Sequence, residues 1–398
     1  MTPPAPGRPP SRSEPSRTTA RGVAIAALVA TESGQRANLM LPRLLSESGL
    51  DERDRSFATE LAYGALRMCR ACDWLIGQFA KGELEPEVRA AARAGAYQLL
   101  YMRVPAYAAV SATVAECPAR ARSLLNAVLR RVADLVEAGP LRWPDPGTRL
   151  SYPDWVIRRL GEDLGAQRAE AALEQMNQAA FPTVRADGYI QDAGSQAVGE
   201  YMAALLTEAP SGPVLDLCAA PGGKATFLAH SAQLVVGADV APARAKMVAA
   251  NAARLELANV AVVLADGTAP PFRPAGFAGV LVDAPCSGLG VLRRRPDARW
   301  RVRPEDVGRL AGLQRRLLRA AVPLVRPRGV LVFSVCTLTR AETSDIDGWL
   351  GHELAQHPGW EATAPPARPW EPLRRGALLL PQAAGTDGMY MLALRRHT

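Results

Sequence analysis

The stretch Val214-Leu-Asp216-Leu-Cys-Ala-Ala-Pro221-Gly222-Gly223-Lys224-Ala-Thr-Phe-Leu228 decides the fold. A short apolar run ends in a polar turn that is rich in glycine, and a segment with helical apolar periodicity follows. Glycine lets the backbone approach a ligand closely, and the first turn of a helix presents N–H groups without intrahelical partners. The stretch therefore predicts the first strand, turn and helix of a Rossmann-like α/β domain that binds a ligand at the carboxyl end of its sheet.

Two further predicted strands, residues 234–239 and 260–266, also end in aspartate. Asp239 lies at about the distance at which Rossmann-like folds hold ribose hydroxyls. The phosphate-binding P-loop pattern fails, because Cys218 and Ala225 occupy its first glycine and its Ser/Thr position, and no G-x-G-x-x-G is present. One such aspartate is usually a cap or turn residue, but three in consecutive units favour a cofactor. A ligand with a ribose and no pyrophosphate fits best, which predicts S-adenosylmethionine.

Two cysteines follow two more apolar runs that read as buried parallel strands. Cys286 comes three residues after Asp283, and Cys336 follows residues 330–335. Both should emerge at the carboxyl ends of neighbouring strands, where open α/β sheets bind ligands. A buried thiol is ordinarily inert packing, but two at the mouth of one sheet indicate covalent chemistry.

Several motifs carry a family resemblance. Residues 218–224 (Cys-Ala-Ala-Pro-Gly-Gly-Lys), 283–288 (Asp-Ala-Pro-Cys-Ser-Gly), 294–300 (Arg-Arg-Pro-Asp-Ala-Arg-Trp), 334–337 (Ser-Val-Cys-Thr) and 385–390 (Gly-Thr-Asp-Gly-Met-Tyr) resemble the Sun/Nop family of RNA cytosine-C5 methyltransferases. The whole chain is similar to the bacterial Sun/Fmu (RsmB-like) branch. The resemblance implies an S-adenosylmethionine-dependent enzyme that forms 5-methylcytosine in RNA, with 16S ribosomal RNA as the substrate.

The same resemblance implies a role for each site residue. Cys336 is the nucleophile that adds to carbon 6 of cytosine, Cys286 assists product release, and Asp283 pairs with the cytosine ring beside Lys224. The residues alone leave the two cysteine roles open, because Pro-Cys also resembles the nucleophile motif of DNA cytosine methyltransferases. The cofactor set is Cys218, Ala219, Ala220, Pro221, Gly222, Gly223 and Lys224 for the methionine part, Asp239 with Arg244 for the ribose, Asp266 for the adenine, and Asp283.

The chain departs from the family pattern at three places. Val335 replaces a threonine before the nucleophile, and Ala341-Glu342-Thr343-Ser344 stands where Glu-Asn-Glu is expected. The second departure weakens the case for a local hydrogen-bonding role there, but not for the reaction. Most of a small α/β subdomain that supports RNA placement is missing near residues 185–190.

A net charge of +8, with arginine well above lysine, suits a phosphate-rich partner. The predicted RNA contacts after the Cys286 loop are Arg293, Arg294, Arg295, Arg299 and Trp300, since guanidinium and indole groups suit splayed RNA. An arginine-rich solvated face is the alternative.

Residues 21–138 show helical periodicity throughout, with predicted helices near 23–32, 37–48, 54–80, 86–102, 107–116 and 120–138. They resemble the NusB-like RNA-binding domain of Sun/Fmu proteins, in which Arg130 and Arg131 would contact RNA or simply end a solvated helix.

The predicted organisation is α+β and multidomain: an all-α NusB-like bundle followed by a Rossmann-like α/β methyltransferase domain. The boundaries are a disordered tail over 1–20, the bundle over 21–138, a linker over 139–150, a helical connector with the truncated RNA-binding subdomain over 151–190, and the methyltransferase domain over 191–398.

Composition and spacing limit the remaining possibilities. Six cysteines lack the spacing of a disulfide scaffold, and the Cys69-x-x-Cys72 and His352…His357 pairs do not have the spacing of a metal site. The apolar run at 23–30 is too short to span a membrane. We expect a cytoplasmic monomer without metal. The alternative functions are a non-catalytic RNA-binding or ribosome assembly factor that retains a cofactor-binding fold, and a small-molecule methyltransferase.

Overall fold

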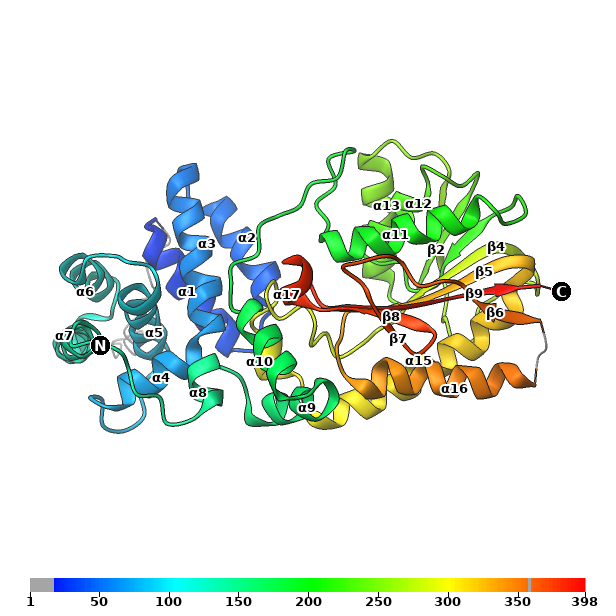
Figure 1. Cartoon of the computed structure of the whole chain (residues 1–398). Helices are drawn as coiled ribbons and strands as arrows, with labels where there is room; N and C mark the ends of the chain where they lie inside the picture. Colours follow the sequence, from blue (N-terminus) through cyan, green and yellow to red (C-terminus); the bar gives the residue numbers. More distant parts are fainter. Residues whose placement is uncertain (1–17, 357–358, 398) are drawn as a thin grey trace, which may run out of the picture. The chain divides into compact units, whose positions relative to one another are not determined.

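The computed structural model describes residues 18–356 and 359–397 (Figure 1). The chain divides into two compact units, residues 1–152 with 295–297 and residues 153–294 with 298–398. The tail predicted over 1–20 lies outside the described residues as far as position 17. Thr19 already caps the first helix, because its hydroxyl accepts a hydrogen bond from the Gly22 amide.

The first unit is entirely helical where it is described. Its elements are α1 (Ala20–Glu32), α2 (Ala37–Glu47), α3 (Glu52–Arg67), α4 (Cys69–Gly77), α5 (Pro86–Tyr101), α6 (Ala106–Ala115), η1 (Ala119–Ala121), α7 (Arg122–Glu137) and α8 (Pro146–Leu150). Helix α5 lies in the centre and packs against α1, α3, α4, α6 and α7. Leu28, Leu61, Leu75, Leu125 and Leu129 are fully buried in this core, which confirms the predicted helical bundle.

Two predictions for this unit are wrong in detail. The helix expected over 54–80 is two helices, because Met68 leaves helical geometry at φ −103° and ψ 22°. The second half of the expected linker over 139–150 is the helix α8. Arg70 holds this segment to α4 through the Asp145 carboxylate at 3.1 Å and the Tyr152 carbonyl at 2.7 Å.

The second unit contains a sheet with the order β3-β2-β1-β4-β5-β9-β8-β7, and β6 pairs with β9. The strands are β1 (Val214–Asp216), β2 (Val235–Asp239), β3 (Val260–Leu264), β4 (Phe277–Asp283), β5 (Val325–Val335), β6 (Trp360–Ala362), β7 (Glu371–Leu373), β8 (Gly376–Leu379) and β9 (Met389–Arg396). Strands β1 to β5 pair in parallel and β9 pairs antiparallel to β5. The carboxyl ends of the five parallel strands therefore meet at one edge.

Helices cover both faces of this sheet (Figure 1). Those near one face are α11 (Ala193–Leu206), α12 (Gly223–Leu228) and α13 (Pro242–Arg254); those near the other are α15 (Pro304–Ala321) and α16 (Ser344–Ala355). Cover on both faces explains why β4 and the second half of β5 are continuous apolar runs. The predicted α/β fold of this half is confirmed.

The remaining elements of the second unit are α9 (Asp154–Leu164), α10 (Ala166–Gln175), α14 (Ala298–Arg301), η2 (Val322–Leu324), η3 (Arg340–Glu342) and α17 (Pro381–Ala384). A small hairpin lies near residues 184–190, where the sequence predicts a truncated subdomain. Val184 and Ile190 form an antiparallel bridge, and the Arg185 amide donates to the Tyr189 carbonyl at 2.9 Å. Across the described parts of both units, no helix combines the length and the apolar character that a membrane crossing requires.

Candidate active site

The glycine-rich turn between β1 and α12 is held against its neighbours by close backbone contacts. Gly222 adopts φ +108°, and a Cβ atom there would lie 3.2 Å from the Cα atom of Val248. Only glycine adopts this backbone geometry without strain. The Ala219 amide donates to the Ala238 carbonyl at 2.9 Å, which ties the turn to β2. The predicted residues 218–224 therefore form one compact turn at the carboxyl edge of the sheet.

The hairpin at residues 184–190 contacts this turn and the start of α12 through Arg185. The guanidinium of Arg185 is buried and donates to the Gly223 carbonyl at 2.6 Å and to the Thr226 hydroxyl at 3.3 Å. It also pairs with Asp187 and lies over the ring of Tyr189. Arg185 carries no local sequence signal for this role, because its partners in the turn lie about forty positions further along the chain.

Asp239 and Arg244 lie together at the end of β2. The buried Asp239 carboxylate accepts from the Ala241 amide at 3.0 Å and from Arg244 Nε at 3.2 Å. Arg244 also donates to the Ala220 carbonyl at 3.1 Å, so it links Asp239 to the glycine-rich turn. The next side chain, Val240, is 66% exposed, which places an apolar surface beside the carboxylate.

Asp266 lies just beyond β3 and is exposed. Its carboxylate accepts hydrogen bonds from the backbone amide and the hydroxyl of Thr268, both at 2.8 Å, and these bonds lower its pKa. The side chain forms an Asx turn. A turn residue is the alternative to a cofactor contact for an aspartate at the end of a strand.

Lys224 and Asp283 form an ion pair across the carboxyl edge. Lys224 Nζ is 2.7 Å from Asp283 Oδ2, and the Ser334 hydroxyl donates to Asp283 Oδ1 at 2.7 Å. Asp283 and Ser334 are partners in the register of β4 and β5, so the backbone pairing sets this bond. Burial acts to lower the pKa of Lys224, but the charge of Asp283 and its hydrogen bond outweigh burial and raise it. The lysine therefore stays a cation in spite of being buried.

Asp216 lies beneath this ion pair. It is 1% exposed, and its Oδ1 atom finds no hydrogen-bond partner within residues 18–356 and 359–397. Burial and the charge of Asp283 raise the pKa of Asp216 to about 7, although Lys224 acts in the opposite direction. One of the two carboxylates near Lys224 therefore titrates close to neutral pH.

The sulfur atoms of Cys286 and Cys336 are 3.3 Å apart, and both side chains are half-buried. The hydrogen bond from Cys286 lowers the pKa of Cys336 below that of an ordinary thiol, against the effect of burial, and Lys224 acts in the same direction. The pKa of Cys286 is raised well above the ordinary value by the same hydrogen bond and by burial. The pKa of Cys336 is therefore the lower of the two, so Cys336 is the thiol that ionises first.

A third cysteine, Cys218, lies in the glycine-rich turn. Burial and the neighbouring Asp216 raise the pKa of Cys218. It is therefore a neutral thiol, in keeping with an expected contact through its backbone.

The arginine-rich segment after Cys286 behaves differently from the prediction. Arg299 is fully buried and donates to the Asn177 side chain at 2.8 Å and to the Met176 carbonyl at 3.1 Å. Arg293 is also buried and donates to the carbonyls of Ala179 and Gly385. Both hold the segment after α10 in place, so the prediction that they form an exposed RNA contact is wrong.

The other predicted RNA contacts are exposed. Arg294 pairs with Asp387, whereas Arg295 and Trp300 lie at the surface of their respective units. Arg130 and Arg131 are exposed on α7, and Arg131 lies over the ring of Phe79. These five residues stay predicted RNA contacts.

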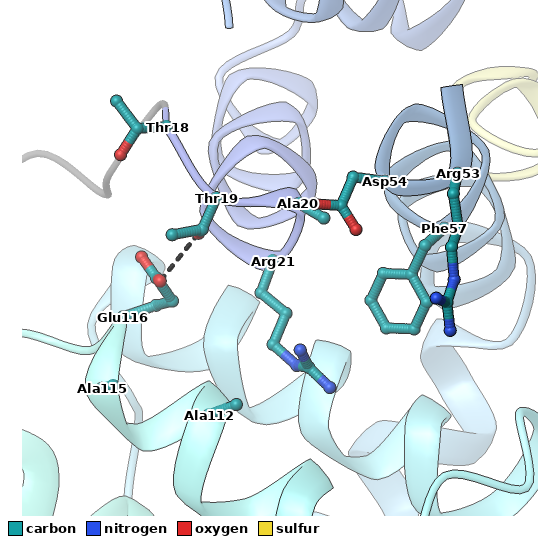
Figure 2. A pocket seen from close by; sticks show the side chains of 10 residues that line it. All are labelled: Thr18, Thr19, Ala20, Arg21, Arg53, Asp54, Phe57, Ala112, Ala115 and Glu116. Carbon is teal, nitrogen blue, oxygen red and sulfur yellow. Dashed lines mark hydrogen bonds between the residues drawn. The ribbon is translucent and has the colours of Figure 1, made fainter. Parts of the chain in front are cut away.

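The first unit contains a pocket of about 460 Å³ (Figure 2). Its lining is Thr18, Thr19, Ala20, Arg21, Arg53, Asp54, Phe57, Ala112, Ala115 and Glu116. Two arginines face two carboxylates there, so the lining carries no charge excess that would attract phosphate, and no predicted site residue belongs to it. In the described part of the chain, no group of three or more His, Cys, Asp and Glu side chains could hold a metal ion.

The residues at the carboxyl edge fit an adenosine-containing methyl donor. The glycine-rich turn leads into the N-terminus of α12, Asp239 is a buried carboxylate at the end of β2, and Val240 supplies an exposed apolar surface beside it. This set offers a backbone turn at a helix N-terminus, a partner for ribose hydroxyls and a surface for a purine.

Comparisons with known proteins agree with this architecture. A family model described as 16S rRNA methyltransferase RsmB/F matches residues 203–395, and a NusB family model matches residues 18–134. Ribosomal RNA small subunit methyltransferase B of Thermus thermophilus is 36% identical, over 95% of this chain and 98% of its own length. A putative methyltransferase of Mycobacterium tuberculosis is 36% identical over 91% of this chain and 93% of its own. The crystal structure of PH0851 matches 95% of this chain and 99% of its own with a TM-score of 0.74 and 20% identity, which shows a shared fold.

Proposed function

The chain belongs to the RsmB/F family of 16S rRNA methyltransferases, and from this premise we propose that it forms 5-methylcytosine in small-subunit ribosomal RNA, with S-adenosylmethionine as the methyl donor. The observation that carries the proposal is the pair of sulfur atoms 3.3 Å apart beside the Lys224–Asp283 ion pair. Methylation at a nitrogen or oxygen atom needs no protein nucleophile, whereas carbon 5 of cytosine reacts only after carbon 6 has been attacked.

The first step belongs to Cys336. Its lowered pKa favours the thiolate, which is the form that adds to carbon 6 of cytosine. Addition places negative charge on the pyrimidine ring. Asp283 would accept a hydrogen bond from the cytosine amino group, and the Lys224 ammonium beside it would offset the charge that develops.

The cofactor would lie between the glycine-rich turn and the end of β2. The backbone of residues 218–224 would hold its methionine part, Asp239 with Arg244 its ribose, and Asp266 its adenine, against the exposed side chain of Val240. When bound, S-adenosylmethionine supplies an electrophilic methyl group. The protein supplies the orientation that brings this group to carbon 5 of the cytosine.

The last step belongs to Cys286. The hydrogen bond to Cys336 is the largest cause of its raised pKa, and this bond is lost once the Cys336 sulfur is bonded to carbon. Cys286 can then lose its own proton to solvent, and the resulting thiolate removes the proton from carbon 5. The electron pair of that C–H bond re-forms the ring double bond, and the carbon 6–sulfur bond breaks to return Cys336 as a thiolate. The unequal pair thus supplies a nucleophile first and a base second.

The test is methyl transfer from labelled cofactor into small-subunit ribosomal RNA that lacks the modification. Cys336→Ala should abolish product, and Cys286→Ala should trap a covalent protein–RNA adduct that survives denaturing electrophoresis. Cys117→Ala is the matched control, because this buried thiol lies in the helical unit, and it should leave product formation unchanged.

Each other outcome has a defined meaning. Adduct with Cys336→Ala and none with Cys286→Ala would exchange the two roles. Absence of transfer to naked RNA, to small subunits and to their assembly intermediates would refute methylation and leave a non-catalytic assembly factor.

A further inference from the structure

Glu342 is a buried carboxylate that connects the two cysteine loops. It lies in the 3₁₀ turn η3 and is 0% exposed. From the Cys286 loop it accepts hydrogen bonds from the Ser287 amide at 2.8 Å and the Ser287 hydroxyl at 2.5 Å. From the Cys336 loop it accepts from the hydroxyls of Thr337 at 3.3 Å and Thr339 at 2.9 Å.

A helix on one face of the sheet completes this network. Gln314 of α15 donates from one amide nitrogen to Glu342 at 3.1 Å and to the Pro285 carbonyl at 3.0 Å. The hydroxyls of Ser287 and Thr337 also lie 2.8 Å apart. All of these donors are neutral groups, so none of the hydrogen bonds described here pairs the Glu342 carboxylate with a cation. Burying a charge in this way is costly unless hydrogen bonds satisfy it, as they do here.

The loops have a second link between their backbones. The Gly290 amide donates to the Cys336 carbonyl at 3.0 Å, and the Gly388 amide donates to the Gly290 carbonyl at 2.8 Å. These bonds hold the main chain, whereas the Glu342 network holds the residues directly after each cysteine. A carboxylate whose hydrogen bonds, among the described residues, reach neither sulfur atom therefore helps to set the separation of the two.

We propose that Glu342 is a positioning residue that sets the distance between the two thiols and keeps the shared proton on Cys286. The role rests on the proposed function for its biological meaning, but the geometry stands by itself. Glu342 is hydrogen-bonded to Ser287, the residue after Cys286. A negative charge at this place disfavours a thiolate on Cys286, and the charge of Glu342 contributes to the raised pKa of that thiol. Cys336 is then the sulfur that ionises.

Other charged groups face the same thiols. Lys224 on α12 favours the Cys336 thiolate, whereas Asp283 at the end of β4 and Asp387 before β9 oppose it. Arg294 lies close enough to Cys336 for its own pKa to be affected. Among these groups, Glu342 is the one whose charge raises the pKa of Cys286. Its removal should therefore reduce the difference in pKa between the two thiols.

The experiment compares Glu342→Gln with Asp345→Asn in the full-length chain. Asp345 is a half-exposed carboxylate in the same segment that pairs with Arg340, and it lies outside the network. Alkylation of each cysteine by iodoacetamide is followed by peptide mass spectrometry between pH 6 and 10, in the absence of RNA. A parallel assay measures adduct formation with RNA and the KM for the cofactor.

Glu342→Gln should bring the pH midpoints for alkylation of Cys286 and Cys336 closer together, because it removes the charge that raises the pKa of Cys286. The amide nitrogen also cannot accept the hydrogen bonds that the carboxylate accepts. Adduct formation should slow by about 100-fold, because a small misplacement of reacting groups has a large effect on rate. The KM for the cofactor should stay unchanged, as should every property of Asp345→Asn.

Unchanged midpoints in a folded Glu342→Gln protein, as judged by circular dichroism, would overturn the proposal. If that variant does not fold, Ser287→Ala serves in its place, because it removes one donor and keeps the carboxylate. It should shift the same midpoints by a smaller amount, and no shift would overturn the proposal equally. A wild-type protein that shows unequal thiols but methylates no RNA would refute the proposed function and leave this inference intact.

Discussion

The buried carboxylate of Asp216 gives the second unit a stability that depends on pH. Its pKa is raised from 3.8 to about 7, so between these values the folded protein keeps a proton that the unfolded chain has lost. Stability from this group is present at low pH and is lost as pH rises toward 7. Well inside that window each pH unit costs about 1.4 kcal/mol, and the slope halves at the folded-state pKa, so the interval from pH 5 to pH 7 costs about 2 kcal/mol.

The perturbation is Asp216→Asn, which keeps an acceptor for the Cys218 amide and removes the titration. The assay is hydrogen exchange with mass spectrometry of peptides that cover β1 and β4, corrected for the intrinsic exchange rate at each pH. This local measurement is needed because two units in one chain do not have to unfold together.

The wild-type free energy of opening, relative to that of Asp216→Asn, should fall by about 2 kcal/mol from pH 5 to pH 7 and level off above about pH 8. Glu305→Gln, in the exposed first turn of α15, is the control and should follow the wild-type profile. Parallel profiles for the wild type and Asp216→Asn would refute the reasoning, because they would mean that Asp216 titrates alike in the folded and unfolded chain.

Three further substitutions test the packing around the site. Gly290→Ala should destabilise the unit by about 2 kcal/mol and slow adduct formation, because the new Cβ atom would lie 2.0 Å from the Gly388 carbonyl oxygen. Its control is Gly308→Ala, where a Cβ atom on α15 would meet open space. This control should be neutral or slightly stabilising in hydrogen exchange. Arg299→Lys should lower the free energy of opening by about 2 kcal/mol without changing the salt dependence of RNA binding, and the opposite pair of results would restore a direct RNA role. Lys224→Met should raise the alkylation midpoint of Cys336, because the cation that favours its thiolate is removed, and an unchanged midpoint would contradict this account.

Much of the fold could be predicted because its signals are local. The strand before the glycine-rich turn and the run that ends in Asp283 are apolar enough to mark buried parallel strands, and their carboxyl ends had to share one edge. That topology brought Lys224, Asp283 and the two cysteines together. Their distances and the unequal ionisation of the thiols could not be predicted, since they depend on side-chain contacts across the sheet.

The incorrect predictions concern residues whose partners are remote in sequence. A run of arginines indicates positive charge, but it does not indicate that Arg299 turns inward to the residues after α10. The break at Met68 has a similar origin, because helical periodicity continues across it while the backbone does not. The hydrogen bonds of Glu342 were not predicted, because its donors lie in three separate segments around 287, 314 and 337–339. No local sequence pattern indicates that a buried glutamate will accept hydrogen bonds from these serine and threonine hydroxyls.

The site distinguishes two chemically identical thiols by where it places its charges. Lys224 and Asp283 form an ion pair on the Cys336 side, and the lysine favours the thiolate there. Glu342 lies on the Cys286 side among neutral donors, and its charge disfavours a thiolate. The two side chains are identical, so the difference in their pKa values comes from the charged groups around each position. The hydrogen bond between the two thiols, the Lys224 cation and the charge of Glu342 all act to make Cys336 the thiol with the lower pKa, which is the order that the proposed roles of nucleophile and base require.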